Sequence, residues 1–124
     1  MNTSKIIKEL IYLPRKFHQI KTQSIVLLLK ETGYSEIQNK VEIQEIRDAL
    51  VSNPECISDW MQYSEDKRTS SGWYFKPKGT DKFVVGYLSE GRHSKKHLSE
   101  YDNDVDACAI FIKHEIDDIT ERHF

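Results

Sequence analysis

The chain of 124 residues lacks the features by which a membrane protein or a disulfide-stabilised secreted protein is usually identified. Its apolar runs, residues 25–29 among them, are far shorter than the about 20 residues that a membrane-spanning helix needs. No charged-then-apolar signal sequence opens the chain. Cys56 and Cys108 are the only cysteines, and they lie far apart among apolar helical positions, so we expect two reduced thiols in the core. These absences predict a cytoplasmic protein with no membrane partner.

Motifs that carry chemistry are also missing from the sequence. The five glycines are scattered along the chain, so they form no phosphate-binding loop. His93 and His97 are four residues apart, a spacing that can hold a metal on a helix. Gly91 and the surrounding Lys and Arg residues predict a basic loop instead, and no third ligand follows at a suitable spacing. We therefore expect no metal, no cofactor and no enzymatic activity.

The composition that remains is that of one small globular domain. Apolar residues make up 38% and charged residues 31% of the chain, which argues against disorder, and we expect residues 1–124 to form a single domain. The net charge of −2 conceals an asymmetry, because residues 100–124 contain two basic and eight acidic side chains while the rest of the chain is basic. A pI of about 6.2 argues against a nucleic-acid partner.

Apolar residues recur at helical spacing through the first half of the chain and again at its end. The segments with this period are 4–13, 24–32, one that begins near Asn39, 54–66 and one that begins at Asp104. Pro14 is expected to stop the first helix and Gly33 to end the second in a left-handed conformation. Asn39 and Glu42 have the spacing of a capping box. The segment 24–32 is apolar nearly all round, which predicts a helix buried on two sides.

The pattern changes to a strand period after residue 71. Residues 72–76 and 82–88 are rich in aromatic and β-branched side chains and are separated by a five-residue loop with a glycine, which predicts a hairpin at about 72–88. A weaker pattern places a third strand at about 96–101. The expected fold is α+β, with four to five helices packed around a small antiparallel β-sheet. The predicted core comprises Ile25, Leu28, Leu29, Ile46, Leu50, Trp60, Phe83, Val85, Phe111, Ile112 and Ile116.

The segment 64–75, SEDKRTSSGWYF, joins the helical half to the β half. Three adjacent aromatic residues are costly to leave in water, so part of the triplet must be buried or kept for a partner. Because side chains alternate along a strand, Trp73 and Phe75 share one face, which we expect to be the core. Tyr74 points the other way and is the better candidate for a binding residue.

Asp66 and Arg68 in the same segment admit two interpretations. They are an acid and an anion-binding group of an active site, or they belong to the end of a helix. In the second interpretation Lys67 and Arg68 favour the negative end of the helix dipole and Asp66 pairs nearby. We favour the helix-end interpretation.

The last predicted helix has one apolar face and one acidic face. Glu115, Asp117, Asp118 and Glu121 are expected near its C-terminal end, where negative charge opposes the helix dipole at a cost of some tenths of a kcal/mol each. Such a face is usually solvated. It is also the kind of surface that a basic partner would bind, and we predict that these four acids contribute to a partner-binding surface. Tyr74, Asp66 and Arg68 are predicted to belong to the same surface.

Several of these residues together resemble the small bacterial immunity proteins of contact-dependent growth inhibition and related polymorphic-toxin systems. The similar residues are Trp60, Ser64–Arg68, Ser71–Phe75, Val85–Tyr87 and Ala107–Ile116. The resemblance covers about residues 55–120. It implies a cytosolic, non-enzymatic protein that binds and neutralises one cognate toxin domain, often a nuclease, by stoichiometric protein–protein inhibition.

Two hypotheses of different classes therefore stand. The first is a toxin inhibitor, in which complementary charge would speed the capture of a basic nuclease. The second is a small enzyme or ligand-binding domain that uses Asp66, Arg68, Tyr74 and a histidine in a cleft beside the hairpin. A pocket in which these side chains converge would favour the second hypothesis, and a flat charged patch would favour the first.

Overall fold

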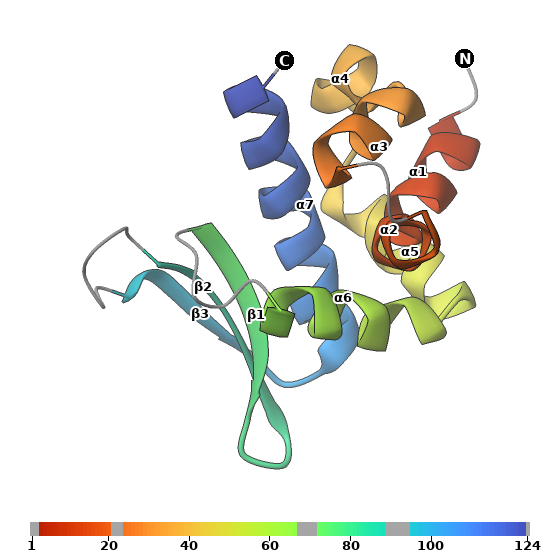
Figure 1. Cartoon of the computed structure of the whole chain (residues 1–124). Coiled ribbons are helices and arrows are strands. Elements are labelled where there is room, and N and C mark those ends of the chain that lie inside the picture. Colours follow the sequence, from red (N-terminus) through yellow and green to blue (C-terminus); the bar gives the residue numbers. More distant parts are fainter. Residues whose placement is uncertain (1–2, 21–23, 67–71, 89–94, 124) are drawn as a thin grey trace.

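The computed structural model describes residues 3–20, 24–66, 72–88 and 95–123 and shows an α+β fold (Figure 1). Across these residues the chain forms seven α-helices, one short 3₁₀ helix and a three-stranded antiparallel sheet. The elements are α1 (Thr3–Ile11), α2 (Leu13–Gln19), α3 (Ile25–Thr32), α4 (Tyr34–Ile37), η1 (Gln38–Lys40), α5 (Ile43–Ser52), α6 (Glu55–Asp66), β1 (Gly72–Lys78), β2 (Lys82–Leu88), β3 (Lys95–Tyr101) and α7 (Asp104–His123). Within the described ranges, no helix is both long and apolar enough to cross a membrane.

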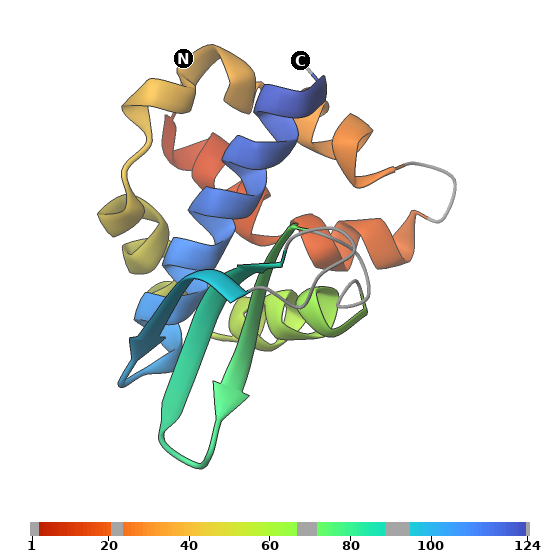
Figure 2. The ribbon, with the colours of Figure 1, turned by 90° about the vertical axis from the view of Figure 1, so that its left-hand side faces the viewer.

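Helix α7 lies at the centre of the fold, between the sheet and the group formed by α1 to α5 (Figures 1 and 2). It packs against α5, α6 and all three strands, and every residue from 104 to 120 is buried or half-buried. Phe111 on α7 contacts Trp60 on α6 and Phe75 on β1, with ring centroids 5.9 and 5.8 Å apart. The indole Nε1 of Trp60 donates to the carbonyl of Ile11 at 2.9 Å, which ties α6 to α1.

The sheet follows the predicted hairpin closely. β1 pairs with β2 from Gly72 opposite Leu88 to Lys78 opposite Lys82, and β3 then pairs with the other side of β2. The third strand is confirmed at Lys95–Tyr101. Gly79 in the turn has φ +72, a left-handed conformation that favours glycine.

β1 is an edge strand, and its outer side is partly closed. The amide of Phe75 points away from β2 and donates to the Ser64 Oγ of α6 at 2.7 Å. Residues two apart on a strand direct their amides to the same side, so position 77 also faces outward. That position is Pro77, which has no amide hydrogen. At both positions, therefore, no N–H group is left without an acceptor.

The core agrees with the sequence prediction, apart from two residues. Ile25 and Phe83 are half-buried, and the other predicted core residues are buried, including Trp60 and Phe111 at 0% exposure. The two cysteines are buried free thiols, as expected. Burial raises the pKa of Cys56 to about 11 and raises that of Cys108 as well.

The helical half departs from the prediction in number and in caps. Four to five helices were expected and seven are present in the described part of the chain, because Pro14 lies in the first turn of α2 and the chain after Gly33 forms the short α4. A proline is compatible with a first turn, where its missing N–H would have no helical acceptor. Asn39 is not the cap of α5: Glu42 is, and it forms a capping box with Glu45.

Helix α3 is not buried on two sides, as its composition predicted. Leu28 and Leu29 are fully buried against the other helices, whereas Leu27 is 42% exposed and Val26 is half-buried. The second apolar face of α3 therefore lies at the surface. The composition of this helix shows that it is apolar, but it does not show which of its faces are buried by other parts of the chain.

Candidate functional site

The four acids of α7 that sequence analysis assigned to a partner-binding surface do not form one exposed face. Glu115 is only 2% exposed, and it accepts a hydrogen bond of 2.5 Å from the hydroxyl of Tyr63 on α6. Burial and the charge of Glu115 raise the pKa of Tyr63. The assignment of Glu115 to an exposed interface is therefore wrong, because the helix buries this carboxylate against α6.

Asp117 is also used inside the molecule. Its Oδ1 accepts hydrogen bonds from the hydroxyl of Tyr34 and from the side-chain amide of Gln38, the second at 3.2 Å. Lys113 joins the same group: its Nζ lies 2.6 Å from the Tyr34 hydroxyl and 3.4 Å from Asp117. Burial and the bond to Asp117 raise the pKa of Tyr34. These bonds hold α4 and η1 against α7, so Asp117 has a structural role.

The other two acids lie nearer to solvent. Asp118 is half-buried and forms an ion pair with Arg122 one turn later, at 3.2 Å, while Glu121 is exposed. Arg122 and His123 occupy the last turn of α7, where positive charge favours the helix dipole. The expected opposition between the acids and the dipole is therefore offset by these residues.

The residues of the alternative hypothesis are not assembled into a described site. Asp66 is exposed at the end of α6 and accepts a hydrogen bond from Gln62 at 3.0 Å. Arg68 lies outside the described residues. Among the residues that are described, Asp66 and Tyr74 share no hydrogen bond or ring contact.

Tyr74 is half-buried, on the face of the sheet opposite Phe75. Its phenol ring covers Gly86, the residue directly opposite on β2, so closely that a Cβ atom at position 86 would lie 2.5 Å from the Tyr74 hydroxyl. The Lys76 Nζ lies 5.6 Å from the ring centroid. Tyr74 thus packs over a glycine, and only part of its ring remains for a partner.

On the inner face of the sheet, Trp73 stacks on His114 of α7. The rings of Trp73 and His114 are parallel within 7° and 4.0 Å apart. Tyr87 packs edge-on against Trp73 at 5.4 Å, and its hydroxyl accepts a hydrogen bond of 3.0 Å from Arg122. Trp73 is half-buried, whereas Phe75 is 1% exposed, so the core prediction holds fully only for Phe75.

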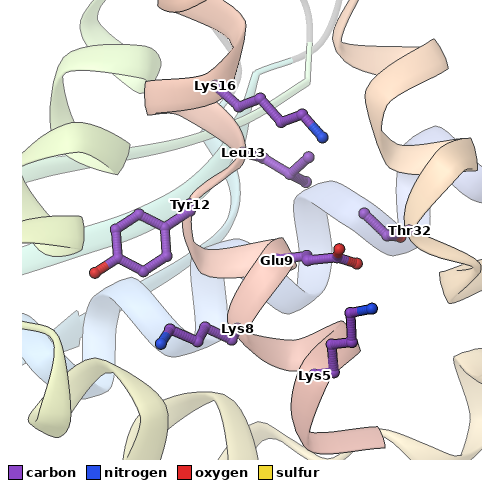
Figure 3. Close-up of a pocket in the computed structure, with 7 residues that line it drawn as sticks. All are labelled: Lys5, Lys8, Glu9, Tyr12, Leu13, Lys16 and Thr32. Atoms are coloured by element: carbon purple, nitrogen blue, oxygen red, sulfur yellow. The ribbon is translucent and has the colours of Figure 1, made fainter. Parts of the chain in front are cut away.

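A hollow that no sequence motif indicates lies between α1, α2 and α3, and we call it the lysine hollow (Figure 3). It has a volume of about 340 Å³ and is lined by Lys5, Lys8, Glu9, Tyr12, Leu13, Lys16 and Thr32. Figure 3 shows Glu9, Leu13 and Thr32 directed toward the space between the helices. The lysines are distributed over 12 positions of sequence with no motif, and only the bend between α1 and α2 groups them.

The bend beside the lysine hollow is held in place by α6. Tyr12 lies between α1 and α2, and its hydroxyl donates to Glu55 at 2.5 Å and lies 3.1 Å from the side-chain oxygen of Asn53. The bond to Glu55 raises the pKa of Tyr12 to about 12 and lowers that of Glu55. Arg15 pairs with Asp59 of α6 at 3.0 Å. The wall of the hollow is therefore fixed by contacts that α6 supplies.

A second hollow, of about 530 Å³, lies beside the exposed face of α3. It is lined by Ser24, Val26, Leu27, Lys30, Ser35 and His123.

In the described part of the chain, no group of three or more His, Cys, Asp or Glu side chains is placed to hold a metal. No family model, no curated protein and no solved structure was found to match the chain.

Proposed function

We propose that this protein is an immunity protein that binds a cognate toxin domain and neutralises it by stoichiometric protein–protein inhibition. The proposal rests first on the residues between about 55 and 120 that resemble immunity proteins of contact-dependent growth inhibition. In the structure those residues belong to one packed unit: Trp60 and Phe75 both contact Phe111, and Ser64 binds the Phe75 amide.

The observation that carries the proposal is how the polar residues are divided between interior and surface. Tyr63 with Glu115 and Tyr34 with Asp117 bond to each other and hold helices together. Two helical segments at the outside carry charge of one dominant sign. α6 contains four acidic and no basic residues, whereas residues 3–19 contain four basic residues and one acidic residue. Surfaces of unlike charge orient a protein partner and speed its association.

Of the acids first assigned to the partner-binding surface, Asp66 and Glu121 remain exposed in the structure. Asp118 is accessible in part and is paired with Arg122. We include these three residues, with the open part of Tyr74, in the proposed toxin-binding surface. No described contact favours the alternative, a small enzyme that uses Asp66 and Arg68.

The experiment is to search the neighbouring reading frames for a toxin domain and to co-express that domain with this protein. We expect growth to be restored and a complex of equal stoichiometry to be isolated by size-exclusion chromatography with light scattering. A toxin domain from an unrelated system is the matched control and should not be bound. If the neighbouring toxin is neither bound nor neutralised, the immunity function is refuted.

The contribution of the exposed acids is tested in the same complex. Asp66→Lys and Glu121→Lys should each slow association with the toxin and reduce its dependence on salt, while changing stability little. Asp48→Lys, an exposed acid on α5, is the control for charge reversal elsewhere. Unchanged association rates for both variants would place the interface outside these residues.

A further inference from the structure

The outer face of the sheet, on the side away from α6 and α7, is covered in part by its own side chains. Figure 2 looks onto this face, with both helices behind the strands. Val84 lies on it, because the neighbouring Val85 belongs to the core, yet Val84 is only 3% exposed. Lys78 of β1 and Glu100 of β3 form an ion pair at 3.2 Å, which crosses β2 beside Val84. Long polar side chains therefore shield an apolar residue here.

Tyr74 covers the next outward-facing position of β2, and its hydroxyl is buried. The ring lies over Gly86, directly opposite on β2. Among the described residues, the buried hydroxyl oxygen of Tyr74 has no hydrogen-bond partner. Burial also raises the pKa of Tyr74. Because a buried hydroxyl without a partner is unfavourable, the ring in this position stabilises the fold less than a phenylalanine ring would.

The ring of Tyr74 is able to leave this position. Its contacts over Gly86 are made by the hydroxyl oxygen and two carbons at that end of the ring, which form the far end of a flexible side chain. The residue as a whole is half-buried, on a face that α6 and α7 do not cover. Rotation about χ1 would move the ring off Gly86 and bring the hydroxyl to the surface, where an acceptor can reach it.

Lys76 indicates which group of a partner fits beside Tyr74. It lies two positions along β1, on the same face, and its Nζ is 5.6 Å from the centroid of the Tyr74 ring. Two other lysines of this face, Lys78 and Lys82, are paired with acids in or just after β3. Lys76 is exposed and, in the part of the chain that the structure describes, has no acidic partner. An ammonium group and a hydroxyl donor side by side match one carboxylate.

We propose that Tyr74 is a movable binding residue, whose ring leaves Gly86 when a protein partner docks and whose hydroxyl then binds, together with Lys76, a carboxylate of that partner. In the free protein the ring shields Gly86 from water. The identification of the partner as the toxin domain rests on the proposed immunity function. The toxin would then meet this pair of donors in addition to the exposed acids.

The first test uses the free protein and compares two tyrosines. Tyr74→Phe removes a hydroxyl that has no described partner, so the urea midpoint should stay the same or rise. Tyr63→Phe removes a hydroxyl that donates to the buried Glu115, so its midpoint should fall. A fall for Tyr74→Phe as well would show that the Tyr74 hydroxyl is hydrogen-bonded in the free protein, and would overturn the proposal.

Gly86→Ala tests the movement of the ring. Gly86 is not among the glycines with positive φ, so alanine suits its backbone, but the Cβ atom would lie 2.5 Å from the Tyr74 hydroxyl and displace the ring. The displaced hydroxyl meets water, so the pKa of Tyr74 should return toward about 10 in an NMR titration with ring-labelled tyrosine. A pKa that stays as high as in the wild type would mean that the ring does not leave the sheet, and would contradict the proposal.

The second test compares affinities for the toxin. Tyr74→Phe should weaken binding about tenfold, because a hydrogen bond to a charged group is lost, and Lys76→Gln should weaken it about threefold. Gly86→Ala, with its ring already displaced, should bind at least as tightly as the wild type, and Lys82→Gln, a paired lysine of the same face, is the control. Equal affinities of Tyr74→Phe and the wild type would overturn this proposal and leave the immunity function standing. If the toxin binds no form of the protein, both proposals fail.

Discussion

The burial of helices α3 and α7 is the reverse of what their sequences suggest. α3 is apolar nearly all round, yet Leu27 is 42% exposed and one of its faces is open. α7 carries acids along its length, yet it is the central helix, and none of its residues from 104 to 120 is fully exposed. α7 is central although it carries many charged residues, and α3 has an exposed face although nearly all its residues are apolar.

The difference shows that a polar side chain can be buried where hydrogen-bond partners are available, whatever its own polarity. A buried charge is unfavourable unless hydrogen bonds replace its lost water. On α7, Glu115 has Tyr63, and Asp117 has Tyr34, Gln38 and Lys113. On α3 there is no comparable cost to exposing one leucine, since isolated apolar side chains are common at protein surfaces.

The largest effect that we expect concerns the two tyrosines bonded to α7. The pKa values of Tyr34 and Tyr63 are raised in the folded protein, mainly by burial. Their contribution to stability is therefore complete below their ordinary pKa of about 10 and is lost as the pH rises above it, because the unfolded chain ionises first. In an alkaline titration, the tyrosinate absorbance of both residues should appear together with loss of circular dichroism. Ionisation of both in a protein that is still folded would contradict their buried placement.

The next largest effect tests the central position of α7. Phe111→Ala should lower the free energy of unfolding by about 3–5 kcal/mol, because it leaves a cavity between Trp60 and Phe75. Urea unfolding measured by fluorescence gives this value. A loss below about 1 kcal/mol would mean that α7 is not the packing centre of the domain.

The adjacent residues Asp117 and Asp118 allow a hydrogen-bonded and a more exposed aspartate of α7 to be compared by their effect on stability. Asp117→Asn should cost about 1–3 kcal/mol, because the Tyr34 hydroxyl and Lys113 lose a charged acceptor. Asp118→Asn, which removes a partly exposed ion pair with Arg122, should cost less than about 1 kcal/mol. Urea midpoints of the two variants make the measurement. Equal losses would show that the polar group around Asp117 does not stabilise the fold.

The smallest effect is expected on the open face of α3. Leu27→Gln should change the free energy of unfolding by no more than about 0.5 kcal/mol, because the side chain is already in contact with water. Leu28→Ala, one residue later and fully buried, should cost about 2–5 kcal/mol. Thermal unfolding of the pair measures the contrast. A large loss for Leu27→Gln would show that this face is covered, for example by a second copy of the chain.

The fold was largely predictable where the signal is local. The strand period after residue 71 located the hairpin, and apolar spacing located the helices that carry Trp60 and Phe111. The sequence did not reveal α4, a single turn after Gly33, because so short a segment has no period of its own. Asn39 was misjudged as a cap because a residue with capping spacing also occurs three residues before the true cap of the helix, Glu42.

The candidate site was much less predictable, since it depends on residues far apart in the chain. Asp117 and Tyr34 are separated by 83 positions, and no feature of the sequence near Asp117 indicates that it accepts a hydrogen bond from Tyr34. The lysine hollow requires the bend at Tyr12, which α6 holds through Glu55. Net charge counted along a segment is therefore a poor guide to the charge of a surface, as residues 100–124 illustrate.

The partly closed edge of β1 has a consequence for how a partner can recognise this protein. A partner that adds a strand to a sheet forms hydrogen bonds with main-chain groups, which are the same in every protein. At positions 75 and 77 no amide is available for such a bond, because the Phe75 amide already donates to Ser64 and Pro77 has no amide hydrogen. At these two positions recognition must then depend on side chains, and a substitution there can change which partners fit. A protein that must distinguish one partner from close variants of that partner gains selectivity from such an edge.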